Sequence, residues 1–250
     1  MATLHLLGTG SSVTDAHRTT TMLAVESAGS VVVVDCGGDV VQQLLAAGLD
    51  PTKVEALVVT HEHADHVGGF PLFMQKTWLH GRREAVPVHG IAPALEQARR
   101  IHDAFRRDGW EGYPGVEWRE IAHVESAPVL TSAAWEITAS PGVHSAPTVG
   151  LRIVDRGTGA CIVYSSDTER AESIARLASG AALLVHEATG AGEGHSSAMD
   201  AARVAAAASA GRLLLTHLPV GSKLDGEVLR QARAVFPNTD VAVEGGRYRF

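Results

Sequence analysis

A chain of 250 residues can form one large α/β domain or two small ones, in either case with a sizeable buried core. The formal net charge of −7 excludes a broad basic surface for nucleic acid, so any such contact would need a local patch. No apolar run approaches the ~18 residues of a membrane span, and no membrane-spanning helix is expected.

Short apolar runs alternate with longer helical patterns along the chain, which predicts an α/β protein. Strands are expected over residues 3–7, 21–25, 31–34, 56–60, 85–89, 135–139, 149–154, 161–164, 182–185, 212–215, 241–243 and 247–250. Helices are expected over residues 40–47, 70–79, 93–107, 169–178, 198–210 and 225–236. No repeat or long linker interrupts this pattern, and we therefore expect a single domain over residues 1–250.

The densest group of metal-binding side chains follows the buried strand expected at 56–60. His61, His63, Asp65 and His66 place three imidazoles and a carboxylate within six residues. Mixed imidazole and carboxylate ligands suit zinc first, and four candidate ligands this close make two adjacent ions plausible. The alternative is that these residues merely cap a helix start, but a cap needs one side chain and not four.

The pattern from His61 to His66 resembles the metal-binding signature of the metallo-β-lactamase superfamily of binuclear hydrolases, which implies further ligands downstream. We sought these ligands where an expected strand runs into a turn. His144, Asp167 and His217 each occupy such a position, after the strands at 135–139, 161–164 and 212–215. Each is weak alone, because such residues are more often caps or turn formers, but together they are a strong signal.

The resemblance also implies the ligand set and the architecture. His61, His63 and His144 would hold one ion and Asp65, His66 and His217 the other, with Asp167 bridging. The expected cofactors are two zinc ions, or manganese, and ions ~3.5–4 Å apart can hold a hydroxide and polarise a phosphoryl or carbonyl oxygen. The expected fold is the four-layer αββα sandwich, in which two mixed β-sheets are flanked by helices.

Within the superfamily, several segments resemble ribonuclease Z and related phosphodiesterases. They comprise residues 7–12, 35–38, 185–189, 194–198 and 214–217. The resemblance implies that Glu187 and His195 lie beside the metals, and that His195 binds phosphate or protonates the leaving oxygen. Physically, a carboxylate next to an imidazole orients it and raises its pKa. His195 could alternatively be the neighbour of a helix N-cap at Ser196 or Ser197.

The sequence departs from ribonuclease Z at two places. Residues 154–160 form only a hairpin turn, where those enzymes usually carry an arm that grips tRNA. Their usual asparagine near the first loop is not evident either, although Arg18 could contact phosphate. Both departures argue against tRNA 3′ processing more than against phosphodiester chemistry.

We therefore predict a phosphodiesterase acting on a small molecule or a flexible RNA end, with Asp65 as ligand and proton acceptor. Alternatives are a lactone or thioester hydrolase with the same metals, and a non-catalytic metal- or nucleic-acid-binding module. An intact set of seven ligands argues against the last alternative, because a structural zinc site is four-coordinate and closed.

The resemblance further implies a homodimer, for which Phe70, Phe73 and Trp78 could form the interface, although core packing explains them at least as well. The two cysteines, Cys36 and Cys161, lie in or next to apolar strands, and residues 1–7 lack the charged start of a signal peptide. We therefore expect reduced thiols in a cytoplasmic protein. The arginine pairs at 82–83, 99–100 and 106–107 are best explained as solvated helix faces at this net charge.

Overall fold

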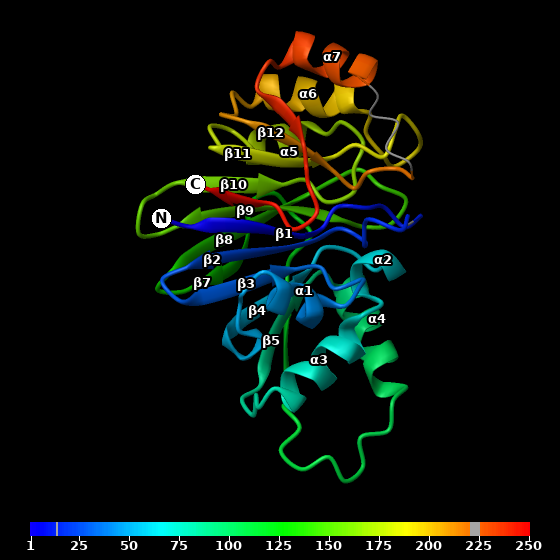
Figure 1. The fold of residues 1–250 in the computed structure, drawn as a ribbon, viewed down its shortest axis with the longest axis vertical. Coiled ribbons are helices and arrows are strands. Elements are labelled where there is room, and N and C mark those ends of the chain that lie inside the picture. The colour runs from blue at the N-terminus through cyan, green and yellow to red at the C-terminus, as the bar shows by residue number, and fades with distance from the viewer. Residues whose placement is uncertain (14, 221–225) are drawn as a thin grey trace.

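The computed structural model describes residues 1–13, 15–220 and 226–250, which build two sheets between two layers of helices (Figure 1). The first sheet has the strand order β14-β1-β2-β3-β4-β5-β6 and the second has the order β13-β12-β11-β10-β9-β8-β7. Helices α1 to α4 lie on the outer side of the first sheet, and α5 to α7 on that of the second. This is the expected αββα sandwich.

The strands of the first sheet are β1 (Thr3–Gly8), β2 (Met22–Ser27), β3 (Ser30–Val34), β4 (Val54–Val59), β5 (Val86–Gly90), β6 (Val116–Glu120) and β14 (Arg247–Arg249). Those of the second are β7 (Ala127–Thr131), β8 (Trp135–Pro141), β9 (Val149–Asp155), β10 (Cys161–Tyr164), β11 (Leu183–Glu187), β12 (Leu213–Thr216) and β13 (Thr239–Val241). The helices are α1 (Val40–Ala46), the 3₁₀ turn η1 (Pro51–Lys53), α2 (Ala64–Val67), α3 (Phe70–Leu79), α4 (Ala92–Asp103), α5 (Glu172–Leu177), α6 (Ala198–Ala207) and α7 (Gly226–Val235).

Both sheets are mixed, because hairpins build one part of each and helical crossovers the other. Strands β3 to β6 run parallel, as do β10 to β13, whereas β7 to β10 and β1 to β3 pair antiparallel. Parallel neighbours need a crossover, and α1, α3, α6 and α7 provide crossovers of this kind. The two ends of the chain meet in the first sheet, where β14 pairs with β1.

The buried side chains form two apolar clusters. One joins the two sheets with α1 to α4 and includes Leu6, Val34 and Trp135. The other packs α5 to α7 against the second sheet and includes Leu215 and alanines of α6. Strands covered on both faces have near-continuous branched apolar residues, which is the pattern that identified β3 and β4 in the sequence.

Two strands were missed by the sequence analysis, and both lie at sheet edges. β6 alternates charged residues with apolar ones and is half-exposed, and β7 contains Pro128. Charges and proline are typical of edge strands because they discourage further pairing. These same features removed the apolar signal that the prediction relied on.

Several predicted boundaries were also wrong. α4 ends at Asp103 and not at residue 107, α5 begins at Glu172 and not at 169, and α6 ends at Ala207 and not at 210. The last helix ends at Val235 and not at residue 236, while its predicted start at Asp225 lies outside the described residues. β13 covers Thr239–Val241 in place of residues 241–243. Capping by Ser197, whose hydroxyl accepts a hydrogen bond from the Asp200 amide, explains why α6 begins where it does.

Three other expectations concern burial. Phe70 and Phe73 are fully buried in the core, so the suggestion that they form a dimer interface was wrong. Both cysteines are buried free thiols, as expected. Across the described residues, no helix combines the length and apolarity needed to cross a membrane.

Candidate metal centre

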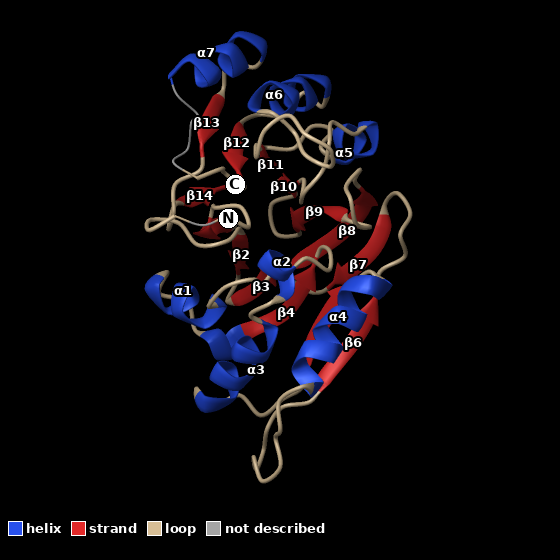
Figure 2. Cartoon of the chain, turned by 90° about the vertical axis from the view of Figure 1, so that its right-hand side faces the viewer, coloured by secondary structure: helices blue, strands red, loops and turns tan. Residues whose placement is uncertain are grey.

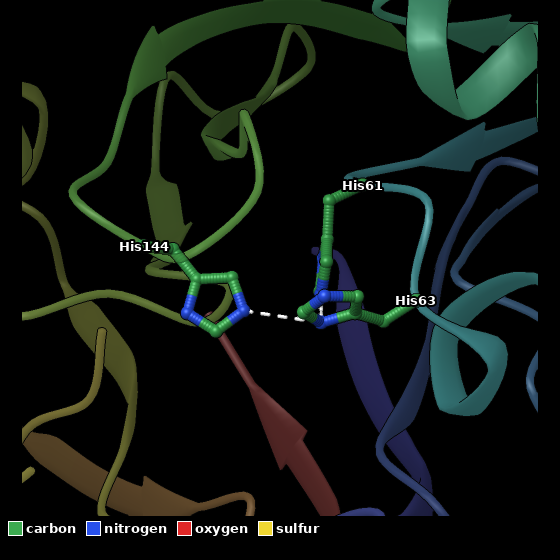
Figure 3. A group of neighbouring side chains, drawn as sticks. All are labelled: His61, His63 and His144. Atoms are coloured by element: carbon green, nitrogen blue, oxygen red, sulfur yellow. Dashed lines mark hydrogen bonds between the residues drawn. The ribbon is translucent and has the colours of Figure 1, made fainter. Parts of the chain in front are cut away.

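The seven predicted ligands come from four strand ends that meet at one edge of the sandwich. β4 leads into the loop of His61 and His63 and into α2, while β8, β10 and β12 lead to His144, Asp167 and His217. Their donor atoms form two groups, in each of which all atoms lie within 4.8 Å of one another. The first group is His61, His63 and His144 (Figure 3), and the second is Asp65, His66, Asp167 and His217.

The imidazoles of the first group point toward one another (Figure 3). Nδ1 of His63 lies 3.2 Å from Nε2 of His61 and 3.1 Å from Nε2 of His144. His63 precedes α2 as its N-cap residue but makes no side-chain capping hydrogen bond. The alternative that this motif serves only to start a helix therefore fails for His63.

Four of the five histidines use Nδ1 for a contact outside the cluster. The partners are Thr60 Oγ1 at 3.1 Å for His61, Asp35 Oδ2 at 2.8 Å for His66, the Gly194 carbonyl at 2.7 Å for His144, and Thr189 Oγ1 at 2.7 Å for His217. Such contacts fix the ring orientation, as they do for histidines that bind metals. Nε2 of these four rings and Nδ1 of His63 are then left facing the cluster.

The carboxylate of Asp167 lies between the two groups. Its Oδ2 is 4.0 Å from Nε2 of His61 in the first group and 3.3 Å from Nε2 of His217 in the second. Its Oδ1 is 3.5 Å from Nε2 of His66. Although burial opposes its charge, the adjacent His217 and His66 hold the pKa of Asp167 well below its usual range. The position and charge suit a carboxylate shared by two cations.

Two further observations indicate that these donor atoms suit divalent metal ions. Nε2 of His66 and Oδ1 of Asp167 are buried without a hydrogen-bond partner, which is costly unless another group supplies one. Burial lowers the pKa values of His61 and His144, which favours the neutral imidazole that metal binding requires. A mixed set of nitrogen and carboxylate donors is typical of zinc sites.

His195 and Glu187 lie next to both groups. The His195 ring is 4.9 Å from the ring of His144 and 5.8 Å from that of His217, and 26% of its side chain is exposed. Its Nδ1 is 2.9 Å from Oε1 of Glu187, and this hydrogen bond raises the pKa of His195. Since Ser197 is the N-cap of α6, His195 is free for a role at the centre.

Glu187 is fully buried, so it positions other groups and does not touch substrate itself. Besides contacting His195, it accepts hydrogen bonds from three backbone amides in three separate segments of the chain. The donors are the amides of Thr168 at 3.1 Å, Thr189 at 2.9 Å and Ser196 at 3.1 Å. One carboxylate thus ties together the segments that follow Asp167, β11 and His195.

Asp35, the first residue of the segment 35–38, contacts a candidate ligand, although no role was predicted for it from its sequence context. It is fully buried at the end of β3 with a left-handed φ of 63°. Besides contacting His66, its carboxylate accepts hydrogen bonds from the amide of Thr60 at 2.8 Å and from its hydroxyl at 3.0 Å. The signal was present, because Asp35 follows a buried strand just as Asp167 does.

The glycines after Asp35 let two backbone segments approach closely. A Cβ at Gly37 would lie 1.8 Å from the carbonyl oxygen of Asp65, so only glycine fits there. The neighbouring amide of Cys36 donates to the carbonyl of His66 at 2.7 Å. The turn over residues 35–38 therefore holds the segment that carries four of the candidate ligands, through its contacts with Asp65 and His66.

Arg18, considered in the sequence as a phosphate contact, lies against the segment after His217. Its Nη1 donates to the carbonyl of Pro219 at 3.5 Å. The same region is held by Leu218, whose amide donates to the carbonyl of Thr9 at 2.9 Å. The first loop of the chain is therefore adjacent to the last candidate ligand.

Replacing Asp35 with asparagine should weaken metal binding about 10–100-fold, because the loss of charge and of an acceptor frees the ring of His66. Asparagine tolerates the left-handed backbone at this position, so the fold should persist. Competition with a chromophoric chelator would measure the affinity. Asp50→Asn is the control and should bind metal normally, because Asp50 is an exposed N-cap of η1 that precedes β4, at the opposite end of that strand from His61. Unchanged affinity in Asp35→Asn would show that Asp35 does not orient a ligand.

The chain matches a known family and several named relatives over most of its length. Residues 31–218 match the family model described as beta-lactamase superfamily domain. The chain is 30% identical to ribonuclease Z of Methanothermobacter thermautotrophicus, over 97% of this chain and 94% of that protein. It is 32% identical to ribonuclease Z of Mycobacterium sp. strain KMS, over 75% of this chain and 69% of that protein.

Solved structures share the fold over nearly the whole chain. The metallo-β-lactamase fold protein YhfI of Bacillus subtilis superimposes with a TM-score of 0.84 at 23% identity, covering 99% of this chain and 98% of that one. The short form of human tRNase Z gives a TM-score of 0.80 at 20% identity, with the same coverage of 99% and 98%. By its family model and its full-length relatives, the chain belongs to the metallo-β-lactamase superfamily, in its ribonuclease Z-like branch, and is a metal-dependent hydrolase.

Proposed function

We propose that the protein is a binuclear zinc phosphodiesterase that acts on small or flexible phosphodiesters, including the flexible end of an RNA. The observation that carries this proposal is the position of His195. Its ring packs against His144 of the first donor group and His217 of the second, and it is held by the buried carboxylate of Glu187. A proton donor thus stands beside both candidate metal positions.

In this proposal His61, His63 and His144 hold one ion, Asp65, His66 and His217 hold the other, and Asp167 contacts both. Zinc is the preferred metal, with manganese as a substitute. Bound metal ions would supply activation of water and polarisation of a phosphoryl oxygen. The rest of the chemistry falls to side chains of the chain itself.

Two side chains can move protons at the centre. Asp65 is partly exposed, with Oδ2 at 3.4 Å from Nε2 of His217 and 3.6 Å from Nε2 of His66. Although burial opposes its charge, the hydrogen bond from His217 lowers the pKa of Asp65 and keeps it ionised, which is the form that can accept a proton from water. Nε2 of His195, opposite the nitrogen held by Glu187, can bind phosphate or give a proton to the leaving oxygen.

The short connection between β9 and β10 supports a small or flexible substrate. Residues 156–160 form a tight turn in which the amide of Gly159 donates to the carbonyl of Asp155 at 2.7 Å. No arm that could grip a folded RNA extends from this turn, every residue of which the structure describes. The relatives named ribonuclease Z support RNA as one phosphodiester substrate class.

Native protein should contain about two equivalents of zinc or manganese per chain. Chelation should abolish hydrolysis of bis(p-nitrophenyl) phosphate, and added zinc should restore it. Because a metal that binds only the folded state stabilises it, zinc should also raise the melting temperature. Elemental analysis, phosphodiester kinetics and thermal melting would measure these three effects.

A parallel panel of lactones and thioesters tests the reaction class. We expect turnover of phosphodiesters to exceed that of both carbonyl substrates. Far faster hydrolysis of the carbonyl substrates would overturn the phosphodiesterase proposal. Natively purified protein without metal would overturn the metal centre as well.

A further inference from the structure

A cavity lies away from the metal centre, at the place where α3, the end of α4 and residues 104–115 meet. It has a volume of about 300 Å³ and is lined by Leu72 of α3, His102 of α4, and Phe105, Trp110 and Tyr113 of the following segment. Figure 2 shows this segment projecting beyond α3 and α4 at the lower end of the molecule. The volume is at the lower limit of the roughly 300–1,000 Å³ typical of small-ligand sites.

The aromatic side chains around this cavity form a preassembled platform. The rings of Trp78 on α3 and Trp110 stack at 5.1 Å with an angle of 8° between their planes. Tyr113 meets Trp78 edge-on at 5.7 Å, and Nε1 of Trp78 donates to the carbonyl of Glu111 at 3.2 Å. The projecting segment is thus fastened to α3 before any ligand binds, which reduces the entropy cost of binding.

Aromatic residues are concentrated in this part of the chain. They make up only 5% of the whole sequence, yet the stretch from α3 to β6 contains three of the four tryptophans. Some of them serve the core, as Phe70 does, but Phe105 is 60% exposed and Trp110 and Tyr113 are half-buried. The partly exposed rings offer flat apolar faces to a ligand.

Guanidinium groups accompany these rings. Arg106 and Arg107 line the cavity, and Arg99 lines the adjoining one, where its guanidinium lies 5.0 Å from the ring centre of Trp118. Arg107 lies 6.0 Å from the ring centre of Tyr113. Asp103 is the one carboxylate among the residues that line the two cavities, and it pairs with Arg107 at 2.8 Å, which leaves Arg99 and Arg106 without a carboxylate partner among those residues. The lining is therefore positive in a chain whose formal net charge is −7.

The nearest ion pair does not neutralise Arg106 firmly. Its guanidinium lies 3.3 Å from Asp108, but the two side chains are 89% and 82% exposed. Exposed pairs of this kind contribute little in water, so Arg106 can turn to an anionic ligand. A ligand that fits must then combine flat rings with negative charges.

From this combination we propose that the aromatic cavity, lined by α3, the end of α4 and residues 104–115, binds single-stranded RNA. A base would stack on the ring of Trp110, and an adjacent phosphate would pair with Arg106. Stacking tolerates any base, so the site holds a strand without reading its sequence. The inference deepens the proposed function, on which it rests, by adding a second contact for the RNA substrate.

The cavity is placed to hold a strand that also reaches the metal centre. α2, which carries Asp65 and His66, packs against α4, whose far end lines the cavity. The twelve residues of α4 span about 18 Å. In Figure 2, α2 and α4 both face the viewer, so the two sites lie on the same side of the molecule and a strand of several nucleotides has the length to reach both.

The test measures binding of a fluorescent 12-nucleotide 2′-O-methyl RNA, which resists cleavage, to the zinc-loaded protein by fluorescence anisotropy. Trp110→Ala should weaken binding by roughly tenfold or more, and Trp110→Phe should recover much of it, because a phenyl ring still stacks. Arg106→Ala should weaken binding and reduce the slope of log affinity against log salt by about one unit. The matched control is Arg230→Ala on α7, an exposed arginine paired at i,i+3, which should bind RNA normally.

Hydrolysis of bis(p-nitrophenyl) phosphate separates this proposal from the proposed function. Both cavity variants should hydrolyse this small substrate at the normal rate, because the cavity does not touch the metal centre. RNA affinities equal to that of the unmodified protein in Trp110→Ala and Arg106→Ala would overturn the cavity proposal while leaving the phosphodiesterase intact. A change of sedimentation in these variants, without a change in RNA affinity, would show that the surface joins two copies of the chain and would also overturn it.

Discussion

Replacing Asp167 with alanine should lower the bound metal from about two equivalents per chain to at most one. It should also reduce phosphodiester turnover by more than about 100-fold, beyond the 10–100-fold typical of residues that only orient ligands. The reason is the position of its carboxylate, which faces His61 in one donor group and His66 and His217 in the other. Without it, five imidazoles and Asp65 would have to hold two dications with a single carboxylate.

Elemental analysis and steady-state kinetics on Asp167→Ala would measure the two effects. Asp155→Ala is the matched control, because Asp155 is as buried as Asp167 but is the last residue of β9, whereas the metal centre lies near the start of that strand. It accepts hydrogen bonds from Ser27 at 3.0 Å and Thr158 at 2.8 Å, so its loss should lower stability and leave the metal content unchanged. Normal metal content and affinity in Asp167→Ala would contradict the shared carboxylate.

That the candidate ligands lie close together could be predicted because strand ends are visible in a sequence. β4, β10 and β12 are buried on both faces, and their apolar runs stop abruptly at His61, Asp167 and His217. Once the two sheets stack, these ends come together at one edge. The resemblance to a known superfamily supplied the grouping of the ligands, which strand ends alone do not reveal.

The supporting contacts could not be predicted in the same way, because they join residues far apart in the chain. Thr189 orients His217 across 28 positions, and Gly194 contacts His144 across 50. Likewise, Arg82 was expected on a solvated face, but it is 7% exposed and donates hydrogen bonds to the carbonyls of Thr52 and Val54, which lie 30 and 28 positions away. Its aliphatic stem and fixed partners make it part of the structure.

The oligomeric state, the cellular location and the identity of the metal are not determined by the fold of one chain. The homodimer and the cytoplasmic location stay predictions, as do zinc and the individual ligand roles. Phe70 and Phe73 are buried and cannot form a dimer interface. The large apolar side chains that are exposed on α1 and α3 and just after α4 are Leu45, Leu72, Leu79 and Phe105, and these could form one. Two of these, Leu72 and Phe105, line the aromatic cavity, so measurements of oligomeric state and RNA affinity bear on the same surface.

Replacing His195 with alanine should reduce kcat by about 10²–10⁴-fold for a dinucleoside monophosphate, whose leaving group is a ribose hydroxyl. The loss should be much smaller for bis(p-nitrophenyl) phosphate, because nitrophenolate leaves without needing a proton. Metal content should stay normal, since none of the proposed ligands depends on His195 for its Nδ1 contact. His80→Ala, an exposed histidine beyond α3, is the control and should have no effect.

The comparison of the two substrates separates the possible roles of His195. Equal losses on both substrates, mainly in KM, would mean that His195 binds phosphate and does not donate a proton. Loss of metal would mean that it is a ligand or a support for one. Glu187→Gln should reproduce part of the leaving-group effect, because the amide cannot stabilise a protonated imidazole as the carboxylate 2.9 Å from Nδ1 does. The glutamine keeps one oxygen that can accept the hydrogen bonds from the amides of Thr168 and Ser196, so the local structure should persist. A loss of activity confined to the substrate with the ribose leaving group would therefore show that Glu187 supports proton donation by His195.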